Sequence, residues 1–434
     1  MIKSFIVKDA KSDAAIMRSR TTNALSSNRI FQTVQYIIDD VAKRGDHAVS
    51  EYTKKLDGVQ LSSLIVTKKE IEDAYAKVTS QQIKSIRLIR DRLAKSETIL
   101  LKHFFREIKT SSDGITTNRS AEPLPSVGCY IPGGKARYPS TVIMCVVPAK
   151  IAKVKRIVAI SPPLKDGRID PLTLVAADIC GVNEFYKIGG AHGIAALALG
   201  TSTVNKVSKI VGPGGVFVTV AKILASRNVS VDMVAGPTEL LIYADSTSPS
   251  RLVALDIVSQ AEHGYETFCG VVTTSNKLAA QIINDIKLII NKGNINRAEI
   301  VRKSLSDNGF VAIARNQSTA ISFANELAPE HLEILSTNAR SISKRVTSAG
   351  LTLIGKYTPS SASDYCLGSN HVLPTMGFAK SRSSLCALDF VKVINIVEAS
   401  RGGLKKVRWA IKEIAYAEGL LNHYEAVKER LMEI

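Results

Sequence analysis

Apolar side chains recur at helical spacing near the start of the chain. Between residues 30 and 56 they fall every three or four positions until Arg44-Gly45-Asp46 interrupts the pattern, and the first of them are Ile30, Phe31, Val34, Ile37, Ile38 and Val41. A second block, residues 68–100, is amphipathic and charged. Spacing of this kind is typical of helices with one buried face, so we predict helices over both blocks.

From residue 127 onward the pattern changes to short aliphatic runs that end in turns of small residues. We predict strands over 127–131, 156–160, 185–188 and 207–211, and a second series over 240–243, 270–272, 310–313 and 351–354. Helical patterns lie between them, for example over 251–262 and 318–327. Strands that alternate with helices indicate parallel sheets, and glycines at strand ends let a ligand approach the backbone at the carboxyl edge.

The two strand series have similar sizes, which suggests a structural duplication, although the sequence shows no internal repeat. A Ser-rich loop over 358–369 is small enough to wrap a site, and residues 402–432 predict one long amphipathic helix. The usual G-x-G-x-x-G fingerprint with a distant acidic residue is absent. The glycine turns therefore leave two interpretations open, a nucleotide site or turns that are merely tight.

Length and composition restrict the class of protein. A chain of 434 residues is too long for one hydrophobic core, so two or more domains are expected. Hydrophobic content of 45% with a single Trp is typical of a soluble α/β protein. No apolar run reaches the roughly 18–20 residues that span a bilayer, and the first residues do not form a signal peptide. We therefore expect a cytoplasmic protein without membrane contact.

The balance of 57 basic and 39 acidic residues leaves a net charge of +18. The basic residues are spread over the chain without blocks and without interleaved aromatics, so we expect a solvated surface and no nucleic-acid partner. The six cysteines include no C-x-x-C pair, which favours reduced, buried thiols. Cys366 is the one reservation, because it follows the candidate site residue Asp364 by two positions.

Histidines beside carboxylates supply the candidate chemistry in a chain with only seven histidines. Gln260 and His263 are three positions apart at the end of a predicted helix, Asp364 lies in the Ser-rich loop, and His423 follows Glu418 by five positions. Two imidazoles, a carboxylate and an amide oxygen form a plausible Zn²⁺ ligand set. The residues alone also allow buried histidines that bond to backbone carbonyls.

Pro329-Glu330-His331 is a second candidate, because proline stiffens the turn and its two neighbours can reach one cavity. Such a pair can serve as general base and activator of water after burial. The alternative is a solvated connection from helix to strand.

Taken in order, these segments and others along the chain resemble the histidinol dehydrogenase family almost from end to end. The likeness begins at Arg44-Gly45-Asp46 and Glu51-Tyr52-Thr53, and its most specific segments are residues 130–134, Asp232-Met233-Val234-Ala235-Gly236-Pro237-Thr238-Glu239, Gln260 with His263, Pro329-Glu330-His331-Leu332, Asn370-His371-Val372-Leu373-Pro374-Thr375, and Ala417-Glu418 with His423. The resemblance implies oxidation of L-histidinol to L-histidine through L-histidinaldehyde, with two NAD⁺ and one Zn²⁺ per subunit, as the last step of histidine biosynthesis.

The resemblance also implies a fold. Two incomplete Rossmann-like αβα domains with parallel sheets are expected, with small terminal helical segments that intertwine in a homodimer. Residues 1–24 form an N-terminal segment, 25–128 with 239–383 the first domain with most metal and catalytic residues, 129–238 the second domain with cofactor contacts, and 384–434 a C-terminal helical dimerisation segment.

The same resemblance assigns roles to individual residues. It implies Glu330 and His331 as catalytic acid/base residues and Tyr130 as a cofactor contact. The implied metal ligands are Gln260, His263, Asp364 and His423, the last from the partner chain together with Glu418. The implied substrate contacts are Thr238, Gln260, His263, His331, Asp364, Glu418 and His423.

Three positions depart from the family pattern. His192 stands where the family usually has Gln and Gly215 where it has Asn, so these two amide contacts to the dinucleotide are absent; His192 could still donate to a phosphate or ribose. Thr238 replaces a usual Ser and keeps the hydroxyl. Two other interpretations stay open. One is a related zinc- and NAD-dependent dehydrogenase of another small amino or acidic alcohol, and the other is a basic nucleic-acid-binding protein without turnover.

Overall fold

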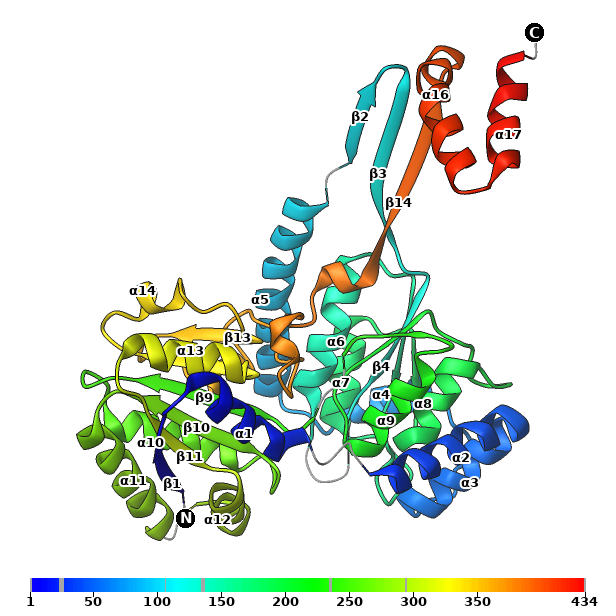
Figure 1. The fold of residues 1–434 in the computed structure, drawn as a ribbon. Helices are drawn as coiled ribbons and strands as arrows, with labels where there is room; N and C mark the ends of the chain where they lie inside the picture. The colour runs from blue at the N-terminus through cyan, green and yellow to red at the C-terminus, as the bar shows by residue number, and fades with distance from the viewer. Residues whose placement is uncertain are drawn as a thin grey trace.

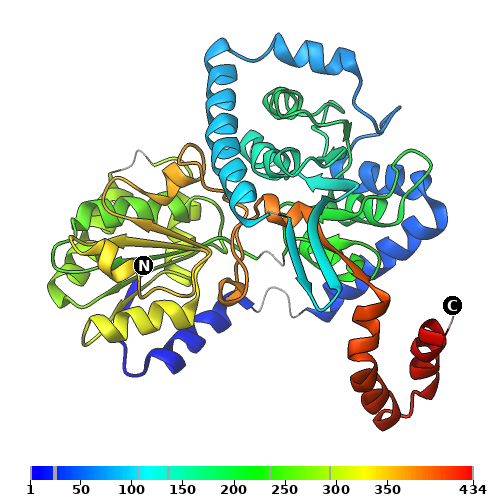
Figure 2. The same cartoon turned by 90° about the horizontal axis from the view of Figure 1, so that it is seen from above.

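Two parallel sheets, each covered by helices on both faces, form the two lobes of the molecule (Figure 1). The computed structural model describes residues 2–22, 27–105, 107–133, 137–233, 236–292 and 295–432. The two lobes lie side by side, and an arm built from residues 108–123 and 391–432 projects from them (Figures 1 and 2).

The first lobe contains a five-stranded sheet in the order β6-β5-β4-β7-β8, with all strands parallel. Its strands are β4 (Ser126–Tyr130), β5 (Arg156–Ile160), β6 (Glu184–Tyr186), β7 (Lys209–Val211) and β8 (Ser230–Val231). From the central strand β4 the chain adds β5 and β6 on one side, and it then adds β7 and β8 on the other side. Open α/β sheets bind ligands at the carboxyl ends of the strands on either side of such a reversal, which here are β4 and β7.

The second lobe repeats this strand order and adds one strand at its edge. Its sheet has the order β1-β11-β10-β9-β12-β13 and is also parallel. The strands are β1 (Lys3–Ile6), β9 (Glu239–Ala244), β10 (Phe268–Thr273), β11 (Phe310–Ile313), β12 (His331–Leu335) and β13 (Leu351–Ile354). The expected duplication is therefore confirmed as a shared topology.

Buried aliphatic side chains on both faces of each sheet explain why the strands read as continuous apolar runs. In the first lobe one face is covered by α2 (Asn28–Arg44), α3 (Asp46–Asp57), α8 (Gly190–Leu199) and α9 (Val216–Ala225), and the other by α4 (Lys68–Tyr75), α5 (Ser80–Phe104), α6 (Pro139–Ile151) and α7 (Pro171–Cys180). In the second lobe one face is covered by α10 (Ser250–Ala261), α11 (Asn276–Asn291) and α12 (Ala298–Asp307), and the other by α1 (Ala10–Thr22), α13 (Gln317–Leu327) and α14 (Ala339–Ser343).

These contacts differ from the expected domain division in two places. Residues 25–128 were expected in one domain with 239–383, but α2 and α3 pack on α8 and α9, and α4 and α5 pack on α6 and α7. The buried stripe of α2 that contains Val34 and Val41 shares a core with Ile194 and Leu197 of α8. Residues 1–24 were expected as a separate segment, whereas β1 pairs with β11 and α1 packs on α13. Side-chain packing, not sequence proximity, thus assigns these helices.

The arm corrects the expected C-terminal segment. Strand β14 (Val391–Ala399) pairs antiparallel with β3 (Ile115–Pro123), which also pairs with β2 (Ile108–Ser112), so residues 384–434 are not wholly helical. The expected single helix over 402–432 is two helices, α16 (Arg401–Ala417) and α17 (Leu421–Met432). Gly419 lies between them with φ of 73°, a left-handed conformation that ends a helix and that glycine adopts without strain.

Two further sequence expectations can be compared with the structure. All six cysteines are free, and Cys129, Cys145, Cys180 and Cys269 are buried, as expected for structural thiols. Among the helices that the structure describes, none is long and apolar enough to cross a membrane.

Glu97 of α5 is a buried carboxyl whose titration should be visible in stability. It is 5% exposed, and its Oε2 accepts a hydrogen bond of 2.6 Å from the backbone N–H of Ala387. Burial raises the pKa of Glu97 to about 7. The hydrogen bond from the Ala387 N–H lowers this pKa, and the negative charge of Asp389 raises it. The folded chain therefore prefers the protonated acid, and its stability falls as pH rises from about 4.5, the ordinary value, to about 7.

We expect Glu97→Gln to remove this pH dependence, because the amide oxygen can still accept from Ala387 and carries no charge. The variant should be as stable as the wild type at pH 5. At pH 8 its free energy of unfolding should exceed that of the wild type by up to about 3 kcal/mol, so it should unfold at a higher temperature. Thermal unfolding followed by circular dichroism at the two pH values measures this difference. A variant less stable than the wild type at pH 8 would contradict the assignment.

Candidate functional site

The predicted catalytic residues meet at the amino edge of the six-stranded sheet. Strand β9 begins at Glu239 and β12 begins at His331, and the two strands are paired with His331 opposite Leu240. Helices α10 and α13 end at this edge, α13 with a left-handed Ala328 at φ 48°. Helix carboxyl ends carry partial negative charge, so this edge favours cations.

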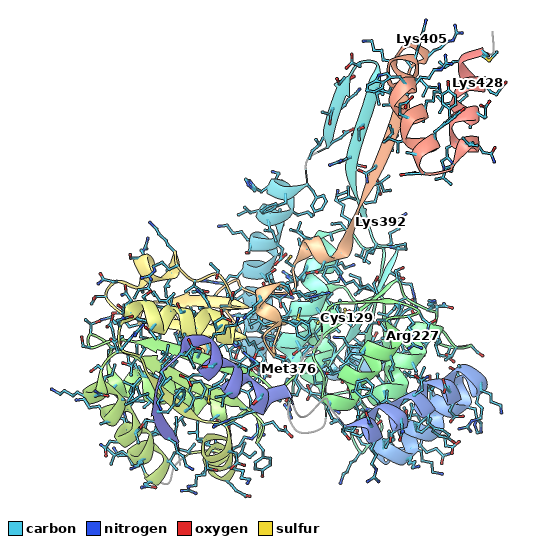
Figure 3. The ribbon with its side chains drawn as sticks, in the orientation of Figure 1. Cys129, Arg227, Met376, Lys392, Lys405 and Lys428 are labelled. Carbon is cyan, nitrogen blue, oxygen red and sulfur yellow. The ribbon has the colours of Figure 1, made fainter. Side chains whose placement is uncertain are left out.

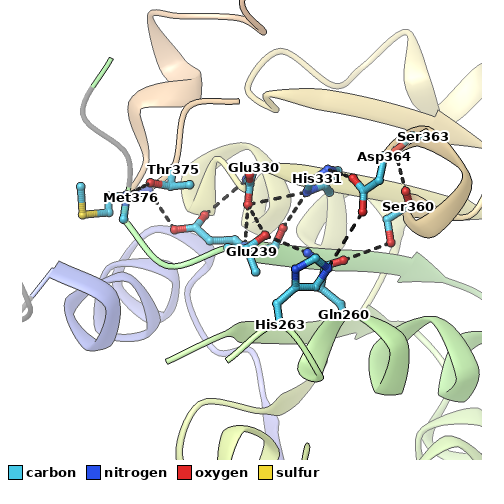
Figure 4. Close-up of polar contacts among 12 residues, drawn as sticks. Glu239, Gln260, His263, Glu330, His331, Ser360, Ser363, Asp364, Thr375 and Met376 are labelled. Carbon is cyan, nitrogen blue, oxygen red and sulfur yellow. Dashed lines mark hydrogen bonds and ion pairs between the residues drawn. The ribbon is translucent and has the colours of Figure 1, made fainter. Parts of the chain in front are cut away.

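Glu330 is held in one orientation by its hydrogen bonds (Figure 4). Its Oε2 accepts from the hydroxyl of Thr238 and from the backbone N–H of Glu239, each at 2.7 Å. The residue is 7% exposed. A solvated connection, the alternative that the sequence left open, is therefore wrong for this turn.

His331 presents one ring nitrogen to the site and is only 2% exposed. Its Nδ1 lies 3.2 Å from the carbonyl oxygen of Glu239, which can only accept, so Nδ1 carries hydrogen and donates it. Its Nε2 has no hydrogen-bond partner among the described residues and lies 3.8 Å from Asp364 Oδ1. Burial lowers the pKa of His331, but the carboxylates of Glu330 and Asp364 outweigh it and raise the pKa to about 9.

Three of the four predicted metal ligands come together beside His331. The side-chain N–H of Gln260 donates to Thr238 Oγ1 at 2.8 Å, which leaves the amide oxygen as the free acceptor, 3.4 Å from Ser360 Oγ. His263 Nε2 lies 4.0 Å from Asp364 Oδ2. An amide oxygen, an imidazole nitrogen and a carboxylate oxygen form a donor set that suits Zn²⁺.

The fourth predicted ligand is elsewhere in this chain. His423 lies on α17 and Glu418 follows α16, both exposed on the arm and away from the amino edge of the sheet (Figure 1). Within the described ranges no three His, Cys, Asp or Glu side chains form a metal-holding group, so the candidate centre depends on the amide of Gln260.

A buried ion pair that the sequence did not reveal supports the site from behind. Glu239 is fully buried and forms an ion pair with Arg18 of α1. It also accepts from the backbone N–H groups of Met376 at 2.8 Å and Glu330 at 3.3 Å. Arg18 donates in addition to the carbonyl of Leu327 at the end of α13. No local pattern around Arg18 could have indicated this contact, because it joins positions 221 residues apart.

The segment after Asp364 links the site to the other lobe. His371 Nδ1 donates to the carbonyl of Asp364 at 2.8 Å, and the amide of Asn370 donates to the carbonyl of Met144 in α6, also at 2.8 Å. Thr375 Oγ1 accepts from Gly236 N–H at 2.6 Å. Met376 lies between the two lobes, whereas Cys129 is inside the first lobe and Lys405 is on the arm (Figure 3). His371 was part of a quoted motif but was not predicted as a site residue.

The candidate cofactor face is the carboxyl edge of the five-stranded sheet. Tyr130 ends β4, and its hydroxyl accepts from the backbone N–H of Gly190, the first residue of α8, at 3.3 Å. Gly215 precedes α9, and a Cβ added there would meet nothing within 4 Å. Two helix amino ends and an open glycine turn at a topological switch point fit a dinucleotide phosphate. Gly134 of the Tyr130 motif lies outside the described residues.

His192 is 1% exposed and faces α3. Its Nε2 lies 3.3 Å from Thr53 Oγ1, whose own hydroxyl donates to the carbonyl of Val49. Nε2 therefore carries the hydrogen, and Nδ1 is left as a buried acceptor without a partner among the described residues. Burial lowers the pKa of His192 to about 4, so the ring is neutral. In this tautomer the ring has no N–H left for a phosphate or ribose, so the donation expected from the sequence would require the hydrogen to move to Nδ1.

Comparisons with known proteins identify one family of relatives. A model of the histidinol dehydrogenase family matches residues 20–431. The chain is similar to the histidinol dehydrogenase of Clostridium acetobutylicum, with 42% identity over 92% of each chain. It is similar to that of Methanocaldococcus jannaschii, with 40% identity over 99% of this chain and 100% of the relative. The crystal structure of histidinol dehydrogenase from Elizabethkingia anophelis superposes with a TM-score of 0.93 at 32% identity and covers 99% of this chain and 98% of that one.

We expect Arg18→Met to destabilise the chain, because it leaves Glu239 buried without its cation. Breaking a buried ion pair from one side costs about 3–5 kcal/mol. The double variant Arg18→Met/Glu239→Gln should recover part of the loss, since the amide oxygen can still accept from Met376. Thermal unfolding of both variants tests this, and a single variant as stable as the wild type would rule out the pair as a support.

Proposed function

Because the chain belongs to the histidinol dehydrogenase family, we propose that it oxidises L-histidinol to L-histidine through L-histidinaldehyde, with two NAD⁺ and one zinc ion. This is the last step of histidine biosynthesis. The observation that carries the proposal is the free Nε2 of His331 beside Gln260, His263 and Asp364, with Glu330 fixed next to it.

Gln260, His263 and Asp364 would hold the zinc ion, which supplies a fixed point for the substrate's imidazole and amine and so orients the carbinol carbon. The orientation of Gln260 supports this assignment, because its N–H group is occupied by Thr238 and its oxygen accepts only the 3.4 Å contact from Ser360, which leaves a lone pair for a metal ion. A positive charge held there would also weaken the influence of Asp364 on the His331 proton and would lower the pKa of the ring toward the working range of a base.

His331 Nε2 accepts the proton of the substrate hydroxyl as the carbinol carbon loses a hydride to NAD⁺. The Nδ1 hydrogen bond to the Glu239 carbonyl stabilises the imidazolium that results, because that donor remains paired throughout. Burial of His331 keeps bulk water away from the proton transfer. One hydride and one proton have then left the alcohol, which gives the aldehyde.

Glu330 activates water for the second oxidation. Its Oε2 is held by Thr238 and the Glu239 N–H, so the carboxylate points in a defined direction when it removes a proton from water. Addition of that water to the aldehyde gives the hydrate, and loss of a second hydride and proton gives the carboxylic acid. The sum is two NADH per histidinol.

A second copy of the chain would complete the site with its Glu418 and His423, and the protein would be a homodimer. The support is that both residues lie on the arm with exposed apolar side chains, among them Ile396 at 58%, Trp409 at 71% and Met432 at 67%. Exposed apolar groups of this size mark surfaces that other protein covers.

The direct test is NADH production from L-histidinol and NAD⁺ by the purified chain, with and without a chelator. We expect two NADH per histidinol, loss of activity on chelation, and recovery on addition of Zn²⁺. His263→Ala should retain the fold and lose the metal. Turnover of another amino alcohol but not of histidinol would instead identify a related dehydrogenase.

We expect His331→Asn to retain zinc and fold while it lowers turnover by roughly 10²–10⁴-fold, the usual contribution of a general base. The amide can still donate to the Glu239 carbonyl, so the loss should appear in kcat rather than in metal content. Steady-state kinetics with metal analysis separate the two, and unchanged turnover would remove His331 from the reaction.

A further inference from the structure

Glu333 is a fully buried carboxyl that the proposed reaction does not use. It follows His331 by two positions on β12, so both side chains project from the same face of the sheet. Its Oε1 accepts from the backbone N–H of Ser360 at 2.6 Å. Glu333 therefore anchors the start of α15 (Ser360–Ser363), the turn that precedes Asp364.

Asp256 faces Glu333 from α10. It lies one turn before Gln260, so the two residues share one face of the helix. With both carboxyls ionised, Glu333 Oε2 has no hydrogen-bond partner among the described residues. One proton on the pair supplies that hydrogen bond. Burial raises the pKa of both carboxyls, and the charge of Asp256 raises that of Glu333 further, which favours one proton shared by the pair.

Few other titratable groups affect this pair. Cys269 of β10 senses the charge of Glu333, and burial raises the pKa of its thiol, so it stays neutral. The proton is thus shared between the two carboxyls.

Ser360 connects the pair to two of the candidate metal ligands. Its hydroxyl donates to Gln260 Oε1 at 3.4 Å. Its carbonyl accepts from the backbone N–H of Asp364 at 3.1 Å and from Ser363 Oγ at 2.7 Å. Ser360 thus contacts both the amide oxygen of Gln260 and the turn that carries Asp364.

We propose that Glu333 and Asp256 form a proton-sharing pair that positions Gln260 and Asp364 for metal through Ser360. Glu333 is a positioning residue, because it touches neither the metal ligands nor the reacting atoms. The inference rests on the proposed function for the metal, but the tether to Ser360 exists without it. Groups that orient ligands from behind typically change metal affinity by roughly 10–100-fold.

The test compares Glu333→Gln with Glu333→Leu. Glutamine imitates the protonated acid, because its oxygen accepts from Ser360 N–H while its amide donates to ionised Asp256. Leucine fills a similar volume and offers neither contact. We expect Glu333→Gln to keep zinc affinity within about threefold and Glu333→Leu to lose at least about tenfold, measured by competition with a chromophoric chelator.

Hydrogen exchange of the metal-free proteins supplies a readout that does not depend on zinc. The amides of 360–364 should exchange faster in Glu333→Leu than in the wild type, and at wild-type rates in Glu333→Gln. If Glu333 only filled space, Glu333→Gln and Glu333→Leu would change exchange to a similar extent, because their side chains have similar volumes. Glutamine would then give no recovery relative to leucine. Equal zinc affinity and equal exchange in Glu333→Leu and wild type would overturn the proposal, and so would equal losses in the two variants.

Ser360→Ala keeps the test decisive if Glu333→Leu does not fold. Alanine retains the backbone bond to Glu333 and loses the hydroxyl contact to Gln260. Zinc affinity should fall while exchange of the 360–364 amides stays unchanged, and unchanged affinity would overturn the link to Gln260. If the wild type binds no zinc, the proposed metal is wrong. Hydrogen exchange of the 360–364 amides in Glu333→Gln and in Asp256→Asn then still decides whether the pair holds Ser360.

Discussion

The parallel pairing of β9 with β12 is the contact on which the candidate site depends. It brings Thr238 and Glu239 beside Glu330 and His331, which are about ninety positions away in sequence. Strand pairing fixes the relative height of these residues, and the short hydrogen bonds to Glu330 follow from that register. A shift by one residue would turn His331 to the opposite face of the sheet and separate it from α10.

Burial of several carboxyls at this edge has to be compensated by positive charge or by protons. Arg18 neutralises Glu239, the ring of His331 lies between Glu330 and Asp364, whose charges favour its protonated form, and Glu333 shares a proton with Asp256. Unpaired carboxylates in such a setting would be strongly unfavourable. A divalent cation at Gln260, His263 and Asp364, as proposed, would therefore relieve a local excess of negative charge.

Most elements could be predicted from sequence, because parallel strands and amphipathic helices leave strong apolar patterns, as α2 and β5 do. Sequence-based prediction of the elements failed where the apolar pattern is weak. Strand β14 is largely exposed on both faces, so its residues show no alternation, and the break between α16 and α17 rests on the left-handed Gly419. Motif resemblance indicated Glu330, His331, Gln260, His263 and Asp364. Arg18 and Ser360 escaped because their roles come only from tertiary contacts.

The two lobes share a topology but present opposite edges to their candidate ligands. The five-stranded sheet offers its carboxyl edge, where the amino ends of α8 and α9 carry partial positive charge suited to phosphate. The six-stranded sheet offers its amino edge, where α10 and α13 end and their partial negative charge suits a metal ion or an imidazolium. One duplicated architecture thus provides sites of opposite polarity, because the field of a helix reverses from one end to the other. An anionic dinucleotide and a cationic centre can then be bound by one chain without competition for the same kind of site.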